Sequence, residues 1–277
     1  MNKNFAKILR FKNEIQSLFL VLIVMIVLLF LFVRMNWVFL AASVILGLLY
    51  IRLLQARQLG NSLQINEKQF SEIYGEAKEC ARILQIKKMP KIFIAQDPVL
   101  NAFTMGFKSP YTIVLNSGLV ESMSMDEIRI VIGHEMGHVK FGHCLLLSLM
   151  SPLGNNLAFV DLLFGYWSRK TEYTADRCGL VCSKKSNDAA VRVMIKIAIG
   201  PKACSGVNFE AIYEQLQNVR EKYIDKAGEL LGSHPYILKR IWEINKFSYQ
   251  YNIRPCAKCG NINLKESIFC WSCGNKN

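Results

Sequence analysis

Residues 134–138 of this 277-residue chain read His134-Glu135-Met136-Gly137-His138. Histidines four positions apart on a helix lie on the same face, so both imidazoles can bind one metal ion. The glutamate beside the first histidine can reach a water on that ion and act as a general base. The pattern HExxH therefore indicates the active site of a zinc peptidase. The alternative, a chance run of ordinary helix residues, is disfavoured because the chain has only four histidines.

A helix is expected around this motif. Ser124 and Glu127 have the spacing of a capping box, which satisfies backbone N–H groups at a helix start. The apolar positions that follow recur at helical spacing and form a stripe for burial against a core. These positions are Ile128, Val131, Ile132, Met136 and Val139. The metal-binding residues would then lie on a buried, rigid element.

A catalytic zinc needs a third protein ligand, because its fourth position stays open for water. His143 comes five residues after His138, one short of the metzincin spacing, and is interpreted as a helix-end residue. Glu172 is the better candidate, since Glu172 and Asp176 are four apart and share a helix face. Glu172 would bind zinc while Asp176 orients a histidine. Spacing alone leaves open a solvated pair of charged residues.

The pair HEMGH and SRKTEYTAD (residues 168–176) resembles the HtpX-like membrane gluzincins, relatives of the CAAX prenyl endopeptidase, from about residue 70 to residue 245. That family has HExxH, then a glutamate in an ExxxD helix, then His-Pro near the end of the domain. The resemblance implies an α+β gluzincin domain and a zinc metalloendopeptidase. It assigns His134, His138 and Glu172 to the catalytic zinc, Glu135 to the base and Asp176 to the acid that holds a ligand.

Two further elements match the same family. His234-Pro235 with Arg240 matches its HPxxxxR element, and the implied role is to stabilise the carbonyl oxygen as it becomes negative. The alternative is a capping histidine and a surface arginine. Asn101-Ala102-Phe103, followed by Tyr111 to Val120, resembles the substrate-side hairpin. An edge strand here would pair with any extended peptide or protein, including unfolded and membrane proteins, through main-chain hydrogen bonds.

The N-terminal region has two almost wholly apolar runs, Ser17 to Val33 and Trp37 to Ile51, separated by Arg34-Met35-Asn36. A single helix of roughly 50 Å would place Arg34 near the middle of a bilayer, so a transmembrane hairpin is predicted. Basic residues outside both runs indicate that both ends of the hairpin face the cytoplasm. We therefore expect a multi-pass protein of the cell membrane with its catalytic domain in the cytoplasm. A cleaved signal peptide is the competing interpretation, disfavoured by the length of the first run.

The nine cysteines include two CxxC pairs near the C-terminus. Cys256, Cys259, Cys270 and Cys273 have the spacing of a small zinc ribbon, in which four thiolates close the coordination of a structural zinc. About twenty residues cannot bury a sufficient core, so the metal would supply most of the folding energy. Free or disulfide-bonded thiols are the alternative. The five single cysteines suit a reducing compartment.

The predicted organisation is a basic N-terminus (1–16), the hairpin (17–51), a linker helix (52–69), the metallopeptidase domain (70–251) and the ribbon (254–277). The class is mainly α with a small β-sheet, whose strands include Lys91–Ala95 and Thr112–Asn116. Residues 144–167 are interpreted as a membrane-surface or substrate-gating lobe.

Partners follow from charge and from the ribbon. The net charge of +13 is attributed to contact with the lipid bilayer rather than nucleic acid, for which no further fold signature is present. The ribbon is a binding module that could recognise substrates, a protein partner or nucleic acid. Two zinc ions, one catalytic and one structural, are expected. The competing function is a membrane-tethered scaffold with little or no peptidase activity.

Overall fold

The structure is a computed structural model. It describes residues 3–106, 109–144, 146, 158–183, 187–208, 211–212, 214–215, 235–250, 254–255, 258 and 262–263. Within these ranges the chain is mostly helical with a small mixed sheet, as the sequence predicts, and a separate two-stranded sheet near the C-terminus.

The sheet has four strands in the order β1-β2-β4-β3. They are β1 (Ser62–Ile65), β2 (Lys91–Ala95), β3 (Ala102–Met105) and β4 (Thr112–Asn116). The parallel pair β2 and β4 forms the centre, and β1 and β3 add to it in antiparallel fashion. Every residue of β4 is buried. The two strands predicted from sequence are confirmed as β2 and β4.

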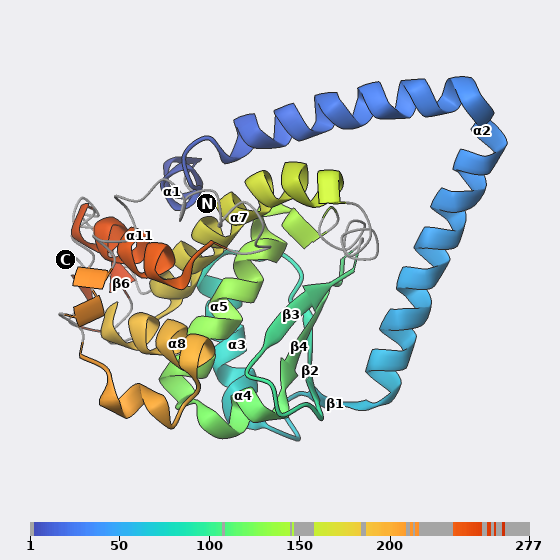
Figure 1. Ribbon diagram of the computed structural model, residues 1–277. Coiled ribbons are helices and arrows are strands. Elements are labelled where there is room, and N and C mark those ends of the chain that lie inside the picture. The colour runs from blue at the N-terminus through green and yellow to red at the C-terminus, as the bar shows by residue number, and fades with distance from the viewer. Residues whose placement is uncertain are drawn as a thin grey trace.

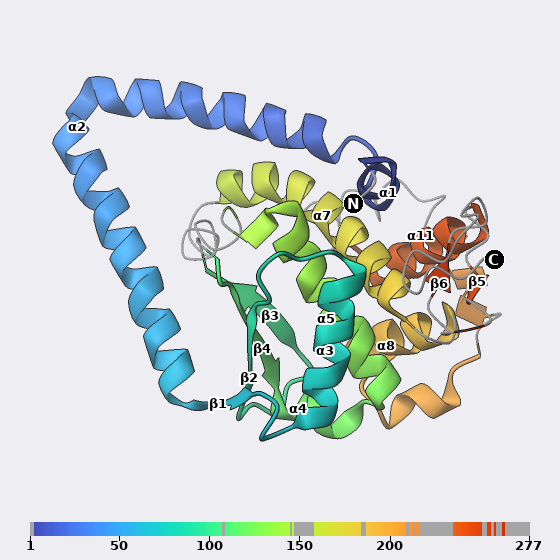
Figure 2. The same cartoon turned by 180° about the vertical axis from the view of Figure 1, so that it is seen from behind.

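Helices cover one face of this sheet. They are α3 (Ser71–Ile83), α4 (Ser117–Ser122), α5 (Met125–Phe141), α7 (Ala158–Cys182), α8 (Asn187–Ile199) and α11 (Ile237–Gln250). Both views place α5 between the sheet and α7, with α8 and α11 farther from the sheet (Figures 1 and 2). A continuous apolar core joins side chains of the sheet to those of α3, α5, α7, α8 and α11. The helix that carries HExxH is therefore central.

Local sequence fixes both ends of α5. Ser124 accepts a hydrogen bond from the backbone N–H of Glu127, and the Glu127 carboxylate accepts one from the backbone N–H of Ser124 at 2.8 Å. This confirms the predicted capping box. Gly142 ends the helix with φ of 75°, a conformation that favours glycine. The start of the metal-binding helix is thus set by residues that adjoin the motif.

Glycines bring α5 and α7 unusually close together. A Cβ atom on Gly137 would lie 2.9 Å from Cys178 Cβ, and one on Gly133 would lie 2.7 Å from Cys182 Cβ. From the opposite helix, a Cβ on Gly179 would lie 2.8 Å from the backbone oxygen of Ile130. The two helices therefore meet nearly backbone to backbone at the level of the HExxH motif.

Helix α2 corrects the prediction for the N-terminal region. After α1 (Lys3–Leu9), a single helix α2 runs from Glu14 to Gly60, passing through residues 34–36 without a loop. These residues contain neither Gly nor Pro, and the helix continues through them. Among the described residues, no helix has the length and apolar character required to span a bilayer. The predicted transmembrane hairpin is wrong.

The arms of α2 leave the domain and return to it. Figure 1 shows a sharp bend about half-way along α2, with one arm beside α7 and the other descending to β1. In the first arm, Val21 packs with Phe164 and Trp167 of α7. At its other end α2 stops at Gly60, so residues 62–65 form β1 where a linker helix was expected.

The C-terminal region is described in part. Two short strands, β5 (Arg254–Pro255) and β6 (Ile262–Asn263), pair in antiparallel fashion. The four cysteines of the expected zinc ribbon lie outside the described residues, as do residues 147–157 of the expected lobe. The remaining part of that lobe from residue 158 belongs to α7, and its Trp167 is buried.

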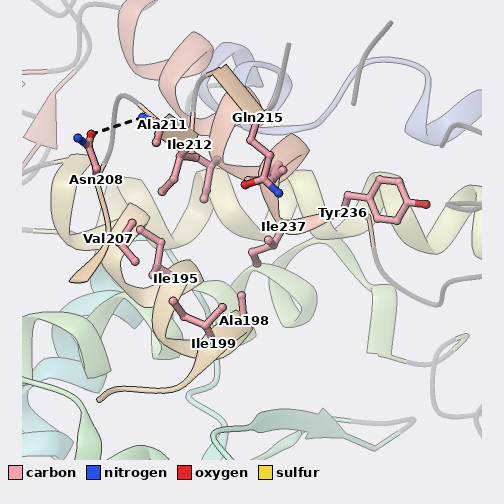
Figure 3. Close-up of a pocket in the computed structure, with 12 residues that line it drawn as sticks. Ile195, Ala198, Ile199, Val207, Asn208, Ala211, Ile212, Gln215, Tyr236 and Ile237 are labelled. Atoms are coloured by element: carbon pink, nitrogen blue, oxygen red, sulfur yellow. Dashed lines mark hydrogen bonds between the residues drawn. The ribbon is translucent and has the colours of Figure 1, made fainter. Parts of the chain in front are cut away.

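An apolar pocket of about 530 Å³ lies between α8, α11 and the residues Val207, Asn208, Ala211, Ile212 and Gln215. Figure 3 shows Ile195 and Ile199 of α8 opposite Ile237 of α11, whereas Tyr236 points away from these side chains. The described lining residues include no histidine, cysteine or carboxylate, so this pocket offers none of the usual metal ligands.

The contact between α5 and α7 predicts opposite effects for two Gly→Ala substitutions. Gly179→Ala should lower the free energy of unfolding by about 1–3 kcal/mol, because the new methyl group meets the backbone oxygen of Ile130. Gly75→Ala, in the exposed middle of α3 with no atom near its Cβ, should raise it by about 0.5–1 kcal/mol. Urea unfolding measures both. Equal effects would contradict the close approach of the two helices.

Candidate metal centre

Helices α5 and α7 bring His134, His138 and Glu172 together. Their ligand atoms all lie within 4.8 Å of one another. The two histidine Nε2 atoms are 3.3 Å apart. Glu172 places Oε2 at 3.6 Å from Nε2 of His134 and Oε1 at 3.4 Å from Nε2 of His138. Three donors from two helices thus surround one point.

This arrangement fits zinc. Four ligands about 2.0–2.1 Å from zinc at the corners of a tetrahedron lie about 3.3–3.4 Å apart, close to the observed separations. Two imidazoles and one carboxylate form a known donor set of catalytic zinc sites that leave one position open. His138 and Glu172 are buried, so such an ion would be largely shielded from solvent on the protein side.

Each histidine has a partner at its outer ring nitrogen. Nδ1 of His134 lies 2.9 Å from Oδ1 of Asp176, to which it donates. Nδ1 of His138 instead lies 3.1 Å from Nδ1 of His143, whose Nε2 is 3.2 Å from Oε1 of Glu14. The contacts at Nδ1 therefore fix the orientation of both rings and direct their Nε2 atoms toward the point shared with Glu172.

Glu135 projects from α5 toward the edge of the sheet. Its Oε2 accepts a hydrogen bond of 2.6 Å from the hydroxyl of Thr104 in β3. In the described sheet, β3 pairs with β4 on one side and has no strand on the other. Residues 102 and 103 belong to this strand, and Asn101 directly precedes it. The structure thus brings the edge strand β3 into contact with the glutamate of HExxH.

Arg240 of α11 joins the site from a third helix. Its Nε and Nη2 donate to the two oxygens of Asp176 at 2.9 and 2.6 Å, and its Nη1 is 3.4 Å from Oε2 of Glu172. The family resemblance implies that Arg240 acts with His234 on the carbonyl oxygen, and His234 lies outside the described residues. In the structure, its guanidinium neutralises two buried carboxylates.

Burial and neighbouring charges together set the protonation of the site. Burial opposes a charge on Asp176, but Arg240 and His134 outweigh it and hold the pKa of the Asp176 carboxyl below its usual value. Burial also lowers the pKa of His138, yet Glu172 and the other nearby carboxylates raise it overall. For His143 burial prevails and lowers the pKa to about 4. The surplus of carboxylates therefore favours a positive charge at the centre, as a divalent cation would supply.

Comparison with known proteins identifies the family. The sequence matches Peptidase family M48 over residues 67–162 and 149–248. The chain belongs to that family. This confirms the predicted resemblance to HtpX-like zinc metallopeptidases, and with it a metallopeptidase function.

Two M48 relatives illustrate the range of similarity. The plastoglobule-localized metallopeptidase 48 of Arabidopsis thaliana chloroplasts is 28% identical over 239 residues, which cover 78% of this chain and 68% of that protein. A protease HtpX homolog from Streptococcus pyogenes serotype M5 is 36% identical over 84 residues, or 30% of this chain and 28% of that protein.

A solved structure shares the fold. The crystal structure of Ste24p from S. mikatae superposes with a TM-score of 0.51 and 17% identity, covering 76% of this chain and 58% of that one. At this identity the likeness concerns the fold alone. The helical domain with its small sheet is thus a fold that the two proteins share.

Sequence reasoning missed three residues of this M48 site. Thr104 directly follows the expected substrate residues 101–103, but no pattern linked its hydroxyl to Glu135. His143 was interpreted as a helix-end residue, and it lies two residues after the end of α5, yet it also contacts His138. Glu14 lies far from the motif in sequence and outside the matched region. No local signal could have found it.

The role of Arg240 in neutralising Asp176 and Glu172 can be tested by substitution. Arg240→Met should lower the free energy of unfolding of the metal-free protein by about 3–5 kcal/mol, because it leaves Asp176 and Glu172 buried without their cation. Lys246→Met, an exposed change on the same helix, should alter it by less than about 0.5 kcal/mol. Similar losses in both variants, measured by urea unfolding, would contradict this role for Arg240.

Proposed function

We propose that this M48 metallopeptidase is a zinc endopeptidase that hydrolyses extended segments of protein substrates. The observation that carries the proposal is the spacing of His134, His138 and Glu172, which suits tetrahedral zinc, with Glu135 on the same helix as the two histidines. Zinc bound at these donors would polarise the scissile carbonyl and lower the pKa of the attacking water. A scaffold protein would need neither the three donors nor the base.

Glu135 performs the proton transfers in this proposal. Its carboxylate accepts the proton of the attacking water and then delivers it to the leaving amine. The hydroxyl of Thr104 donates to Oε2 and restricts the orientation of the carboxylate, leaving Oε1 for the water. This bond also ties the base to β3, so the substrate strand and the general base are positioned together.

The free edge of β3 supplies the binding mode. An extended segment that pairs with β3 would gain main-chain hydrogen bonds whatever its sequence. Such pairing does not depend on a chain end, which favours cleavage within a polypeptide. The expected substrates are therefore unfolded or flexible protein segments, and Asn101, Ala102 and Phe103 are proposed to contact them.

His234 and Arg240 receive different proposed roles. The chain enters α11 through buried Pro235, and Arg240 in this helix contacts Glu172. His234 is therefore attached to an element of the metal centre and is proposed to donate to the carbonyl oxygen as negative charge develops. Arg240 is proposed to support catalysis by holding Asp176 and Glu172 in place.

A second, structural zinc is proposed for Cys256, Cys259, Cys270 and Cys273. Strand β5 ends immediately before the first cysteine, and β6 lies between the two CxxC pairs. A short antiparallel ladder between cysteine pairs is consistent with a zinc ribbon, whose folding depends on the metal. This ribbon is proposed to dock a protein partner or the substrate.

Two substitutions separate the base from the ligands. Glu135→Gln should retain zinc and lose about 10²–10⁴-fold in turnover of an unfolded protein, because the general base is removed. Glu172→Ala should lose both turnover and the catalytic zinc. Cleavage by wild type and Glu135→Gln alike would contradict the assignment, and an inactive wild type with full zinc would favour a scaffold.

Zinc content tests the two sites independently. Metal analysis of the wild type should give about two zinc ions per chain, and either Glu172→Ala or the double variant Cys256→Ser/Cys259→Ser should give about one. The cysteine variant should keep the zinc bound to the histidines. An unchanged zinc content in the cysteine variant would rule out the ribbon.

A further inference from the structure

We propose that Glu14 and His143 form a relay that fixes the tautomer and ring orientation of His138, which makes both of them positioning residues of the metal centre. This inference rests on the proposed zinc site. It extends the site beyond the matched M48 region, because Glu14 lies in the first turn of α2 and the match begins at residue 67.

The direction of each hydrogen bond follows from what each group can donate. An ionised Glu14 carboxylate only accepts, so the contact of 3.2 Å requires the proton of His143 on Nε2. In the neutral ring, Nδ1 of His143 is then an acceptor. The contact of 3.1 Å between the two Nδ1 atoms is therefore a donation from His138 to His143. This leaves the lone pair of His138 on Nε2, the atom that faces Glu172.

Other contacts hold Glu14 firmly in this position. Its side chain is 1% exposed, and Arg10 Nη1 lies 3.0 Å from Oε1. Thr174 donates its hydroxyl proton to Oε2 of Glu14 and accepts the backbone N–H of Phe11 at 2.8 Å. Arg177 donates to the backbone oxygens of residues 8 and 10. The segment that carries Glu14 is thus built onto α7, the helix that supplies Glu172.

The two ligand histidines reach their carboxylates by different routes. His134 donates directly to Asp176, whereas His138 reaches Glu14 through the ring of His143. A carboxylate buried this deeply costs free energy of folding unless it is paired, so its alignment with a ligand histidine needs a reason. The relay gives that reason, because Glu14 fixes the orientation of the second ligand, His138, through His143. The packing of α2 on the domain is therefore coupled to metal affinity.

Zinc titration of the full-length protein against a competing chelator tests the relay. The zinc-binding step that is present in the wild type and absent in Glu172→Ala is assigned to the site formed by His134, His138 and Glu172. Glu14→Leu and His143→Phe should weaken this step by about 10–100-fold, the usual effect of losing such a partner, and Glu14→Gln, which keeps an acceptor, should weaken it less. Ser17→Ala, a buried change on the same helix whose hydroxyl bonds to the backbone oxygen of Glu14, should leave it unchanged.

Thermal unfolding of the metal-free variants shows whether each variant is folded. Weaker zinc binding by a folded variant can then be attributed to the loss of the hydrogen bonds to His138. Wild-type affinity in folded Glu14→Leu would overturn the relay, as would an equal loss in Ser17→Ala. Absence of the Glu172-dependent step in the wild type would instead overturn the proposed zinc site.

A spectroscopic measurement on the wild type tests the relay even if the variants do not fold. Long-range ¹H–¹⁵N correlation spectra of the zinc-loaded protein should show a proton on Nδ1 of His138 and on Nε2 of His143. A proton on Nδ1 of His143 would overturn the relay, because that ring could then no longer accept from His138.

Discussion

The separation of α5 and α7 is the constraint on which the metal centre depends. Two ligands come from α5 and the third from α7, so the distance between the helices sets the distance between the histidines and Glu172. Gly133, Gly137 and Gly179 allow an approach that larger side chains would prevent. Because backbone atoms form much of this contact, the spacing cannot be adjusted by side-chain rotation alone. A rigid helix pair is what preorganised metal ligands require.

Charge compensation is the second requirement of the site. Glu14, Glu135, Glu172 and Asp176 are all buried within one small region. Each has a specific partner from another element: Arg10 and Thr174 for Glu14, Thr104 for Glu135, and Arg240 for Glu172 and Asp176. These partners come from both ends of the chain and from the sheet. The carboxylates that attract a divalent ion therefore also join the helical and strand elements of the domain.

The sheet has its own part in the proposed chemistry. The buried parallel pair β2 and β4 supports β3, and β3 places its free edge and Thr104 beside Glu135. An extended substrate on this edge would lie next to both the base and the metal ligands. The helical side of the domain supplies the ligands, and the strand side supplies the surface on which a polypeptide can be aligned.

The sequence alone determined the features that depend on neighbouring residues. HExxH and its capping box establish a metal-binding helix, and short β-branched runs predict β2 and β4, because these patterns act over a few positions. Glu172 was identified through its ExxxD spacing together with the family resemblance, and the pattern by itself left a surface pair equally possible. These local patterns predicted the metal ligands and the mainly helical class of the fold.

Only the tertiary structure decided which distant groups meet. The path of α2 through residues 34–36 was misjudged because apolar runs divided by an arginine predict a hairpin, whereas no helix-breaking residue is present to make one. The contacts of Thr104 with Glu135, and of Glu14 with His143, join residues with no shared periodicity. Their positions follow from how β3 and α2 pack on α5 and α7, and such packing is a property of the folded chain rather than of any local pattern.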